Sequence, residues 1–141
     1  MNFPVLETTE RVFRKVLELA CYAGFLTGRE AARRMPPHGH GSIFFTGASA
    51  RMRGGNGYAA FASAKFDLRA VAQSMPRELG PQNIHIAHLV IDAGVDTAWG
   101  CERIHQRSGT EAAERLEPDR LMNPASIAET YWQLHLQTRG G

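Results

Sequence analysis

The chain has 141 residues, of which 43% are hydrophobic, so it is long enough to form one ordinary domain with a buried core. Its formal net charge is only +2 and its basic residues are spread along the sequence, which argues against a nucleic-acid-binding protein. The two cysteines lack the spacing of a disulfide framework or a zinc site, and no apolar run approaches the roughly 18 residues of a membrane span. These features favour a cytoplasmic protein that does not cross a membrane.

Residues 8–35 show the apolar periodicity of a helix with one buried stripe. The apolar positions follow one another at steps of three or four residues: Val12, Val16, Leu19, Ala23 and Leu26. Thr8 or Thr9 is suited to cap the start of this helix. The sequence "PPHGHG" predicts its end, because two prolines cannot continue a helix and the glycines allow a tight turn.

Two short apolar runs flank a second long helix. Residues 41–47 and 84–91 are rich in β-favouring side chains, which predicts two strands buried on both faces. Residues 58–79 have helical periodicity, and Pro76 near their end predicts a kink or an early stop. Because more than thirty residues connect the two strands, their order predicts a right-handed parallel crossover.

The last part of the chain, residues 97–136, is less regular and resembles a lid over a site. One short helix is expected near residues 110–116. A clearer helix follows, because Asn123 is a good capping residue and Pro124 suits the first helical position.

At this point the sequence resembles a known family. The segment "GSIFFTGASARMRGGNGYAAFASAKFDLRAVAQSMPRELGPQNIHI" resembles the active-site half of a short-chain dehydrogenase/reductase. The preceding "CYAGFLTGREAARRM" resembles the family's fourth helix, and "VIDAGVDT" resembles the stretch with a Pro-Gly turn and a cofactor-touching Thr. The resemblance implies a partial doubly wound, Rossmann-like α/β fold in one domain over residues 1–141, with two parallel core strands, long helices and a C-terminal helical lid. It also implies a nicotinamide-dependent oxidoreductase with NAD or NADP as cofactor and a small-molecule substrate.

The resemblance also implies where proton transfer would occur. In the family a Tyr four residues before a Lys exchanges the proton, a Ser thirteen residues before that Tyr holds the substrate oxygen, and an Asn lies on the preceding helix. Lys65 falls on the Lys, but the other three positions hold Phe61, Ala48 and Ala20. A phenyl ring has no hydroxyl and cannot exchange a proton. We therefore expect a degenerate active site and a chain that does not catalyse alone.

Three nearby hydroxyl groups are candidates to replace the missing ones. Tyr58 lies seven residues before Lys65, which is about 10.5 Å along a helix axis. Ser49 points to the opposite face of the strand from its neighbour Ala48, and Ser63 is a helical serine of the kind that bonds back to its own helix. We expect none of these hydroxyls to restore the proton relay.

Lys65, Val95 and Thr97 are the residues that the resemblance places at the nicotinamide end of a cofactor. Asp92 and Ala93 occupy the places of the family's Pro-Gly turn. The sequence has no Gly-x-x-x-Gly-x-Gly loop between a strand and a helix, so we expect the pyrophosphate-binding element to be absent. Binding of NAD or NADP by this chain is therefore in doubt. Alternatively, Lys65 simply extends its ammonium group along the helix to water.

The remaining patterns concern partners rather than chemistry. The histidines of "HGHG" and of "IHIAH" are expected to be structural, since neither set has the spacing of metal ligands. Gly24 and Gly28 allow another helix to approach closely, either within the chain or from a second copy. We expect a homo-oligomer that forms through helices 8–35 and 58–79. The alternative function is therefore a non-catalytic oligomerisation or binding module that docks through these two helices.

Overall fold

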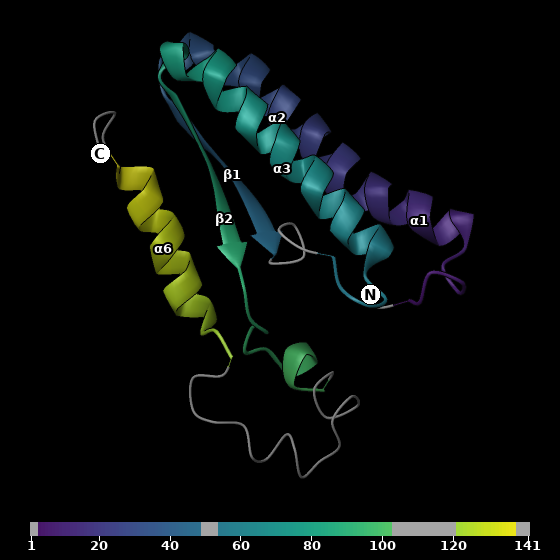
Figure 1. Ribbon diagram of the computed structural model, residues 1–141. Helices are drawn as coiled ribbons and strands as arrows, with labels where there is room; N and C mark the ends of the chain where they lie inside the picture. The colour runs from purple at the N-terminus through teal and green to yellow at the C-terminus, as the bar shows by residue number, and fades with distance from the viewer. Residues whose placement is uncertain (1–2, 49–53, 103–120, 138–141) are drawn as a thin grey trace. The chain divides into compact units, whose positions relative to one another are not determined.

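The computed structural model describes residues 3–48, 54–102 and 121–137 (Figure 1). The chain divides into two compact units, Met1–Ile91 and Asp92–Gly141. The first unit contains two long helical segments and two strands, and the second contains the helix α6. The helix expected near residues 110–116 lies outside the described residues.

The first helical segment runs as α1 (Glu10–Leu17), a π-helical turn η1 (Glu18–Tyr22) and α2 (Ala23–Arg34). Thr9 caps its start, because its hydroxyl oxygen accepts a hydrogen bond of 3.2 Å from the backbone N–H of Val12. The extent of the expected helix is thus confirmed. The π-turn was not expected from the sequence. A 3-10 turn, η2 (Pro36–His38), ends the segment, and Gly39 follows it in the left-handed conformation that glycine tolerates.

The two strands, β1 (Gly41–Ala48) and β2 (Ile84–Ile91), pair in parallel as expected. Gly41 lies opposite Ile84 and Ala48 lies opposite Ile91. Alternate residues point to opposite faces of a strand, and here only one face contributes deeply buried side chains to the core. The prediction of strands buried on both faces was therefore wrong for the described residues. The second face is half-buried over most of its length.

Helix α3 (Ala59–Leu79) connects the strands through a short 3-10 turn, η4 (Gly80–Gln82). It continues through Pro76, so the prediction of an early end was wrong. Two observations explain why the last turn persists. Leu79 is buried in the core, and the guanidinium group of Arg77 donates a hydrogen bond to the carbonyl of Gln73. These contacts offset the backbone hydrogen bond that a proline cannot make.

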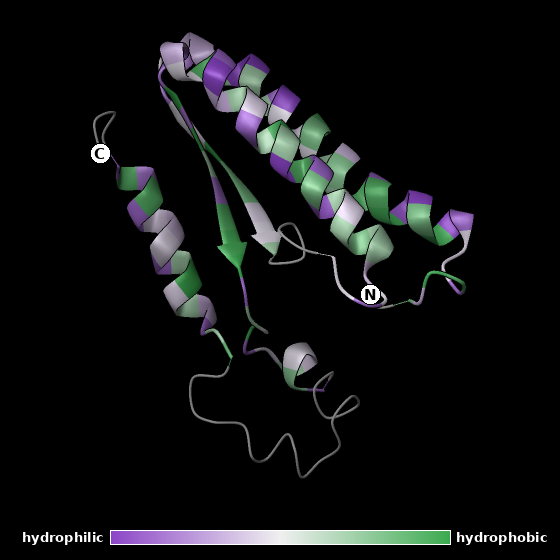
Figure 2. Ribbon diagram, viewed as in Figure 1, coloured by the Kyte–Doolittle hydropathy of each residue, from purple (hydrophilic) through white to green (hydrophobic). Residues whose placement is uncertain are grey.

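The core of the first unit lies between α3, α2 and one face of the strand pair. Its buried members come from α3 and both strands: Ile43, Phe45, Leu68, Ala72, Leu79, Ile84 and Ile86. A second cluster joins α1 to the start of α3 through Val16, Ala60 and Ala64. Figure 2 shows apolar and polar residues alternating along α1, α2 and α3, as expected for helices with one buried side.

In the second unit, α6 (Pro124–Leu136) begins as predicted, since the Asn123 side chain accepts a hydrogen bond of 2.8 Å from the N–H of Ala125. An isolated parallel bridge joins Val95 to Met122. None of the helices among the described residues is long and apolar enough to cross a membrane.

Candidate functional site

The centre of the candidate site is the amine of Lys65 on α3. Its Nζ donates a hydrogen bond of 3.1 Å to the backbone carbonyl of Thr46 on β1. The same nitrogen lies 5.7 Å from the centre of the Phe61 ring, one helical turn earlier. Lys65 therefore extends from the helix to the strand, and it does not simply reach into water along α3. The sequence motif that singled out this residue gave no sign of its partner, because a backbone carbonyl has no side-chain signature.

Burial controls the protonation of Lys65. The side chain is half-buried, and loss of solvent around the ammonium group lowers its pKa below the ordinary value of a lysine. Within the described part of the chain, no carboxylate forms an ion pair with it. The attraction between the ammonium and the Phe61 ring acts in the opposite direction, because it favours the charged form.

The aromatic residue at position 61 is held in place by a second ring. Phe61 and Tyr58 meet edge to face, with ring centres 6.3 Å apart. Tyr58 is the residue before α3, whose first helical residue is Ala59. The helix therefore does not extend to Tyr58, and helical spacing does not place its side chain on the same face as Lys65. This geometry agrees with the expectation that Tyr58 does not take the role of the missing hydroxyl.

The two remaining positions of the motif, 48 and 20, hold alanines, which carry neither a hydroxyl nor an amide. Ala48 is the last residue of β1, at the same end of the strand as Thr46. Ala20 lies within the π-turn and packs against the cluster of Val16, Ala60 and Ala64. π-Turns inside helices occur frequently at functional sites. The position that the resemblance equates with the family's Asn therefore lies in an unusual backbone turn but carries no amide.

The serines near the motif behave as predicted where the structure describes them. The hydroxyl of Ser63 donates to the carbonyl of Ala59 at 2.8 Å, which is the expected bond back to its own helix. Ser49 lies outside the described residues.

The second unit carries the other two predicted cofactor residues. In the bridge between Val95 and Met122, both hydrogen bonds are made by the neighbours of Val95: the carbonyl of Gly94 accepts from Met122, and the N–H of Asp96 donates to Met122. The N–H and the carbonyl of Val95 take no part in this bridge. The hydroxyl oxygen of Thr97 accepts a hydrogen bond of 3.0 Å from the N–H of Gly100. Thr97 thus begins a short helical turn, and its hydroxyl hydrogen is still able to donate. Val95 and Thr97 belong to the second unit, whereas Lys65 belongs to the first.

The sequence did not predict the contact between Cys101 and Asp96 in the second unit. The thiol of Cys101 donates to the Asp96 carboxylate over 3.5 Å, and desolvation together with this carboxylate raises the pKa of the thiol. Such a thiol is protonated and weakly nucleophilic at neutral pH. It therefore adds no nucleophile to the candidate site.

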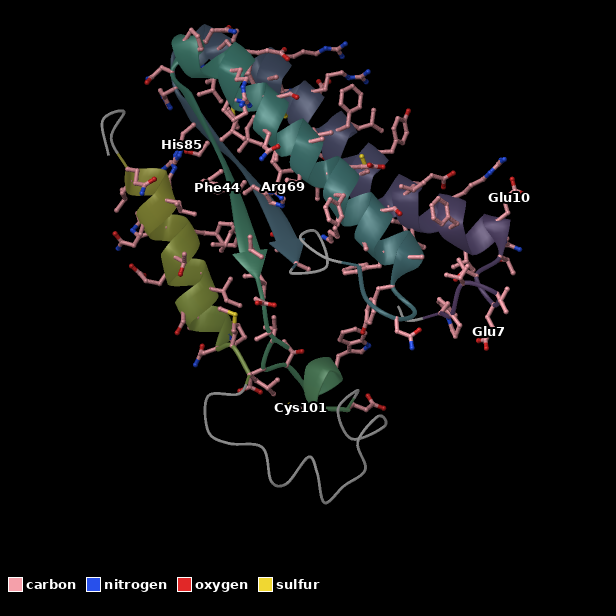
Figure 3. The ribbon with its side chains drawn as sticks, viewed as in Figure 1. Glu7, Glu10, Phe44, Arg69, His85 and Cys101 are labelled. Atoms are coloured by element: carbon pink, nitrogen blue, oxygen red, sulfur yellow. The ribbon has the colours of Figure 1, made fainter. Side chains whose placement is uncertain are left out.

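His85 and the two glycines that the sequence singled out make packing contacts in the first unit. His85 lies on the second face of the sheet, where its ring meets Phe44 edge to face at 6.1 Å (Figure 3). Among the described residues there is no cluster of three side chains suited to hold a metal ion. A Cβ atom added at Gly24 would lie 2.5 Å from the Leu68 side chain, and one at Gly28 would lie 3.1 Å from Phe45. Both glycines therefore allow close packing within the first unit.

Parallel strands joined by a long crossover helix define an α/β protein of the Rossmann type. The family model described as enoyl-(acyl carrier protein) reductase matches residues 1–138. The chain belongs to the short-chain dehydrogenase/reductase family.

Individual relatives agree with this assignment. The chain is 52% identical to a short-chain dehydrogenase from Rhodopseudomonas palustris, with a TM-score of 0.75 over 100% of this chain and 53% of that one. It is 29% identical over 129 residues to the (21S)-21-acetoxyl-apo-melianone synthase of Melia azedarach, covering 86% of this chain and 47% of the synthase. An NAD⁺-bound xylitol dehydrogenase shares the fold at 16% identity, with a TM-score of 0.82 over 96% of this chain and 58% of that one. The chain thus spans about half the length of these relatives.

Lys65 in the first unit, and Val95 and Thr97 in the second, each carry polar groups of a kind that suits contact with a nicotinamide dinucleotide. Lys65 provides a cation beside the C-terminal end of β1, where ligands bind in open α/β sheets. The backbone of Val95 and the hydroxyl of Thr97 provide hydrogen-bonding groups of the kind that would hold an amide. Positions 61 and 48 hold a phenylalanine and an alanine. They provide no hydroxyl to exchange a proton or to hold a substrate oxygen.

Proposed function

We propose that this chain is a short-chain dehydrogenase/reductase polypeptide of the NAD(P)-dependent oxidoreductase type that cannot perform the family's proton transfer alone. The dinucleotide, when bound, would supply or accept the hydride. Lys65, Val95 and Thr97 would hold its nicotinamide end. A small molecule with a carbonyl or hydroxyl group would be the substrate.

The observation that carries this proposal is the pairing of Lys65 with Phe61. Lys65 lies one helical turn after position 61, where the family has its proton donor. The side chain at that position is the phenyl ring of Phe61, which lies beside the Lys65 amine but carries no hydroxyl. A positioned acid or base typically contributes 10²- to 10⁴-fold to a rate, so its loss alone reduces turnover by about this factor. The half-buried cation is retained, which supports cofactor contact rather than chemistry.

Titration with NADH and NADPH, followed by nicotinamide fluorescence, tests the proposal. We expect weak binding with a dissociation constant near or below millimolar, which Lys65→Ala weakens. Lys15→Ala is the matched control, because Lys15 is the only other lysine and lies exposed on α1. Unchanged affinity in Lys65→Ala would overturn the assignment of Lys65 to the cofactor. Steady oxidation of an alcohol by the unmodified chain would overturn the proposed loss of catalysis.

The second candidate function is a non-catalytic oligomerisation module that docks onto a second copy of itself. It is favoured by large apolar side chains that are exposed on the two long helical segments: Leu19 (59% exposed), Tyr22 (57%), Phe25 (41%) and Phe66 (42%). No detectable binding of either dinucleotide would favour this second function over the first.

A further inference from the structure

Helix α6 is apolar on more than one side. Among its thirteen residues, Glu129 is the only aspartate, glutamate, lysine or arginine. Helices of this composition are normally buried in a core, yet no residue of α6 is buried. The side that carries Ile127, Tyr131 and Leu134 is half-buried. Trp132 lies on a different side of the helix and is 55% exposed.

The side of α6 around Trp132 has a symmetric pattern of side chains. Residues three and four positions away along a helix are the neighbours of the central residue on its surface. Four positions before and after Trp132 are Ala128 and Leu136, a small side chain and a large one. Three positions before and after it are Glu129 and His135, a carboxylate and an imidazole. All five residues are exposed.

This pattern complements itself under two-fold symmetry. A two-fold axis at the tryptophan runs two helices in opposite directions, so each position before it meets the matching position after it in the other copy. Ala128 then meets Leu136, and the small side chain leaves space for the large one. The Glu129 carboxylate meets the His135 ring, which has an N–H to donate. Gln133 already donates a hydrogen bond of 2.7 Å to Glu129, and a carboxylate accepts more than one such bond.

We propose that α6 forms a contact between two copies of this chain, in which the two helices pair in opposite directions about Trp132. The partner is a second copy because both the sizes and the charges on this side of α6 complement themselves. The contact goes beyond both candidate functions, since it uses neither Lys65 nor the two long helical segments. A helix of about 20 Å makes a contact smaller than the roughly 1,200–2,000 Å² of a standard interface, so we expect weak association.

Sedimentation velocity over a range of concentrations tests this contact. The chains compared all carry Phe66→Asp, so that association through the long helical segments does not mask the contact at α6. We expect Trp132→Ser to raise the dissociation constant by at least about tenfold, because a central tryptophan dominates many protein contacts. Trp99→Ser is the matched control and should leave it unchanged, since Trp99 is the only other tryptophan and is 67% exposed in the same unit.

Exchange of the two polar residues tests the symmetry of the contact. His135→Glu alone places two carboxylates opposite each other at two places in the dimer, so the dissociation constant should rise by about tenfold. Addition of Glu129→His restores an acid opposite an imidazole at both places and should recover most of the affinity. Within one copy these positions lie about 9 Å apart along the helix axis, so the recovery arises between copies.

Three results would overturn the proposal. They are a chain that stays monomeric at millimolar concentration, equal effects of Trp132→Ser and Trp99→Ser, and no recovery of affinity in the exchanged variant. The dinucleotide titration depends on Lys65 and not on α6, so either proposal can fail without the other.

Discussion

At the scale of single residues, the burial of Lys65 predicts a pH-dependent stability. Its pKa in the folded chain lies below the ordinary value of about 10.4 that applies when the chain is unfolded. Between these two values the unfolded chain binds more protons. The free energy of unfolding therefore gains a contribution from Lys65 as the pH rises through this window, and loses it as the pH falls through the folded pKa.

Lys65→Met removes this titration while keeping an unbranched side chain of similar length. We expect the stability of the natural chain relative to Lys65→Met to increase as the pH is raised toward the unfolded pKa of about 10.4. Urea unfolding followed by circular dichroism measures this difference. Other groups, such as the partly exposed thiol of Cys21, whose pKa is raised by desolvation and by the charge of Asp67, titrate in both proteins and cancel. A difference in stability between the natural chain and Lys65→Met that stays constant with pH would contradict the prediction.

The residue scale also shows where sequence reasoning succeeds. The identities at positions 65, 61, 48 and 20 were sufficient to predict which side chains of the motif lack a hydroxyl or an amide. The carbonyl of Thr46 was not predictable, because any residue at that position presents the same backbone group. The Cys101–Asp96 contact was equally hidden, since a spacing of five residues in an irregular segment predicts no particular geometry.

At the scale of elements, the close packing of α2 against α3 predicts a penalty for enlarging Gly28. An added Cβ would lie 2.9 Å from the sulfur of Met75 and 3.1 Å from the Phe45 ring. Gly28→Val adds two further methyl groups at this buried contact, and overpacking of this kind costs about 1–3 kcal/mol. We expect a lower free energy of unfolding by about that amount, measured by urea titration.

Gly80→Ala provides the matched control for this prediction. A Cβ added at Gly80 meets no atom within 4 Å, and the residue has helical φ and ψ of −55° and −43°. We expect its stability to be unchanged or raised by up to about 1 kcal/mol. Equal effects of the two substitutions would show that α2 and α3 do not pack at Gly28 as described.

The elements themselves were largely predictable, and the exceptions have physical reasons. The strands and long helices follow from strong apolar periodicity and from caps such as Thr9 and Asn123. The π-turn at Glu18–Tyr22 was missed, since one wider turn leaves the steps of three and four residues between apolar positions intact. Pro76 misled the prediction because contacts of the last turn with the core outweigh the lost backbone hydrogen bond.

At the scale of the whole molecule, we propose that the outer side of α3 forms a contact between two copies of the chain. Helical spacing places five residues on the side of α3 opposite Leu68 and Ala72: Ala59, Ser63, Phe66, Ala70 and Ser74. Four of them are small, so a second helix is able to approach this side closely. A two-fold symmetric contact would bring the same surface together from both copies, with each Phe66 packing near small residues of the other.

We therefore predict concentration-dependent self-association that Phe66→Asp weakens. A charge placed in an apolar contact has to be desolvated, so the dissociation constant should rise by at least about tenfold, or 1.4 kcal/mol. Sedimentation velocity over a range of concentrations measures this change. Phe3→Asp is the matched control, because Phe3 is 41% exposed against 42% for Phe66 but lies before the first helix. A monodisperse monomer at all concentrations, or equal weakening by both substitutions, would show that α3 does not form the contact.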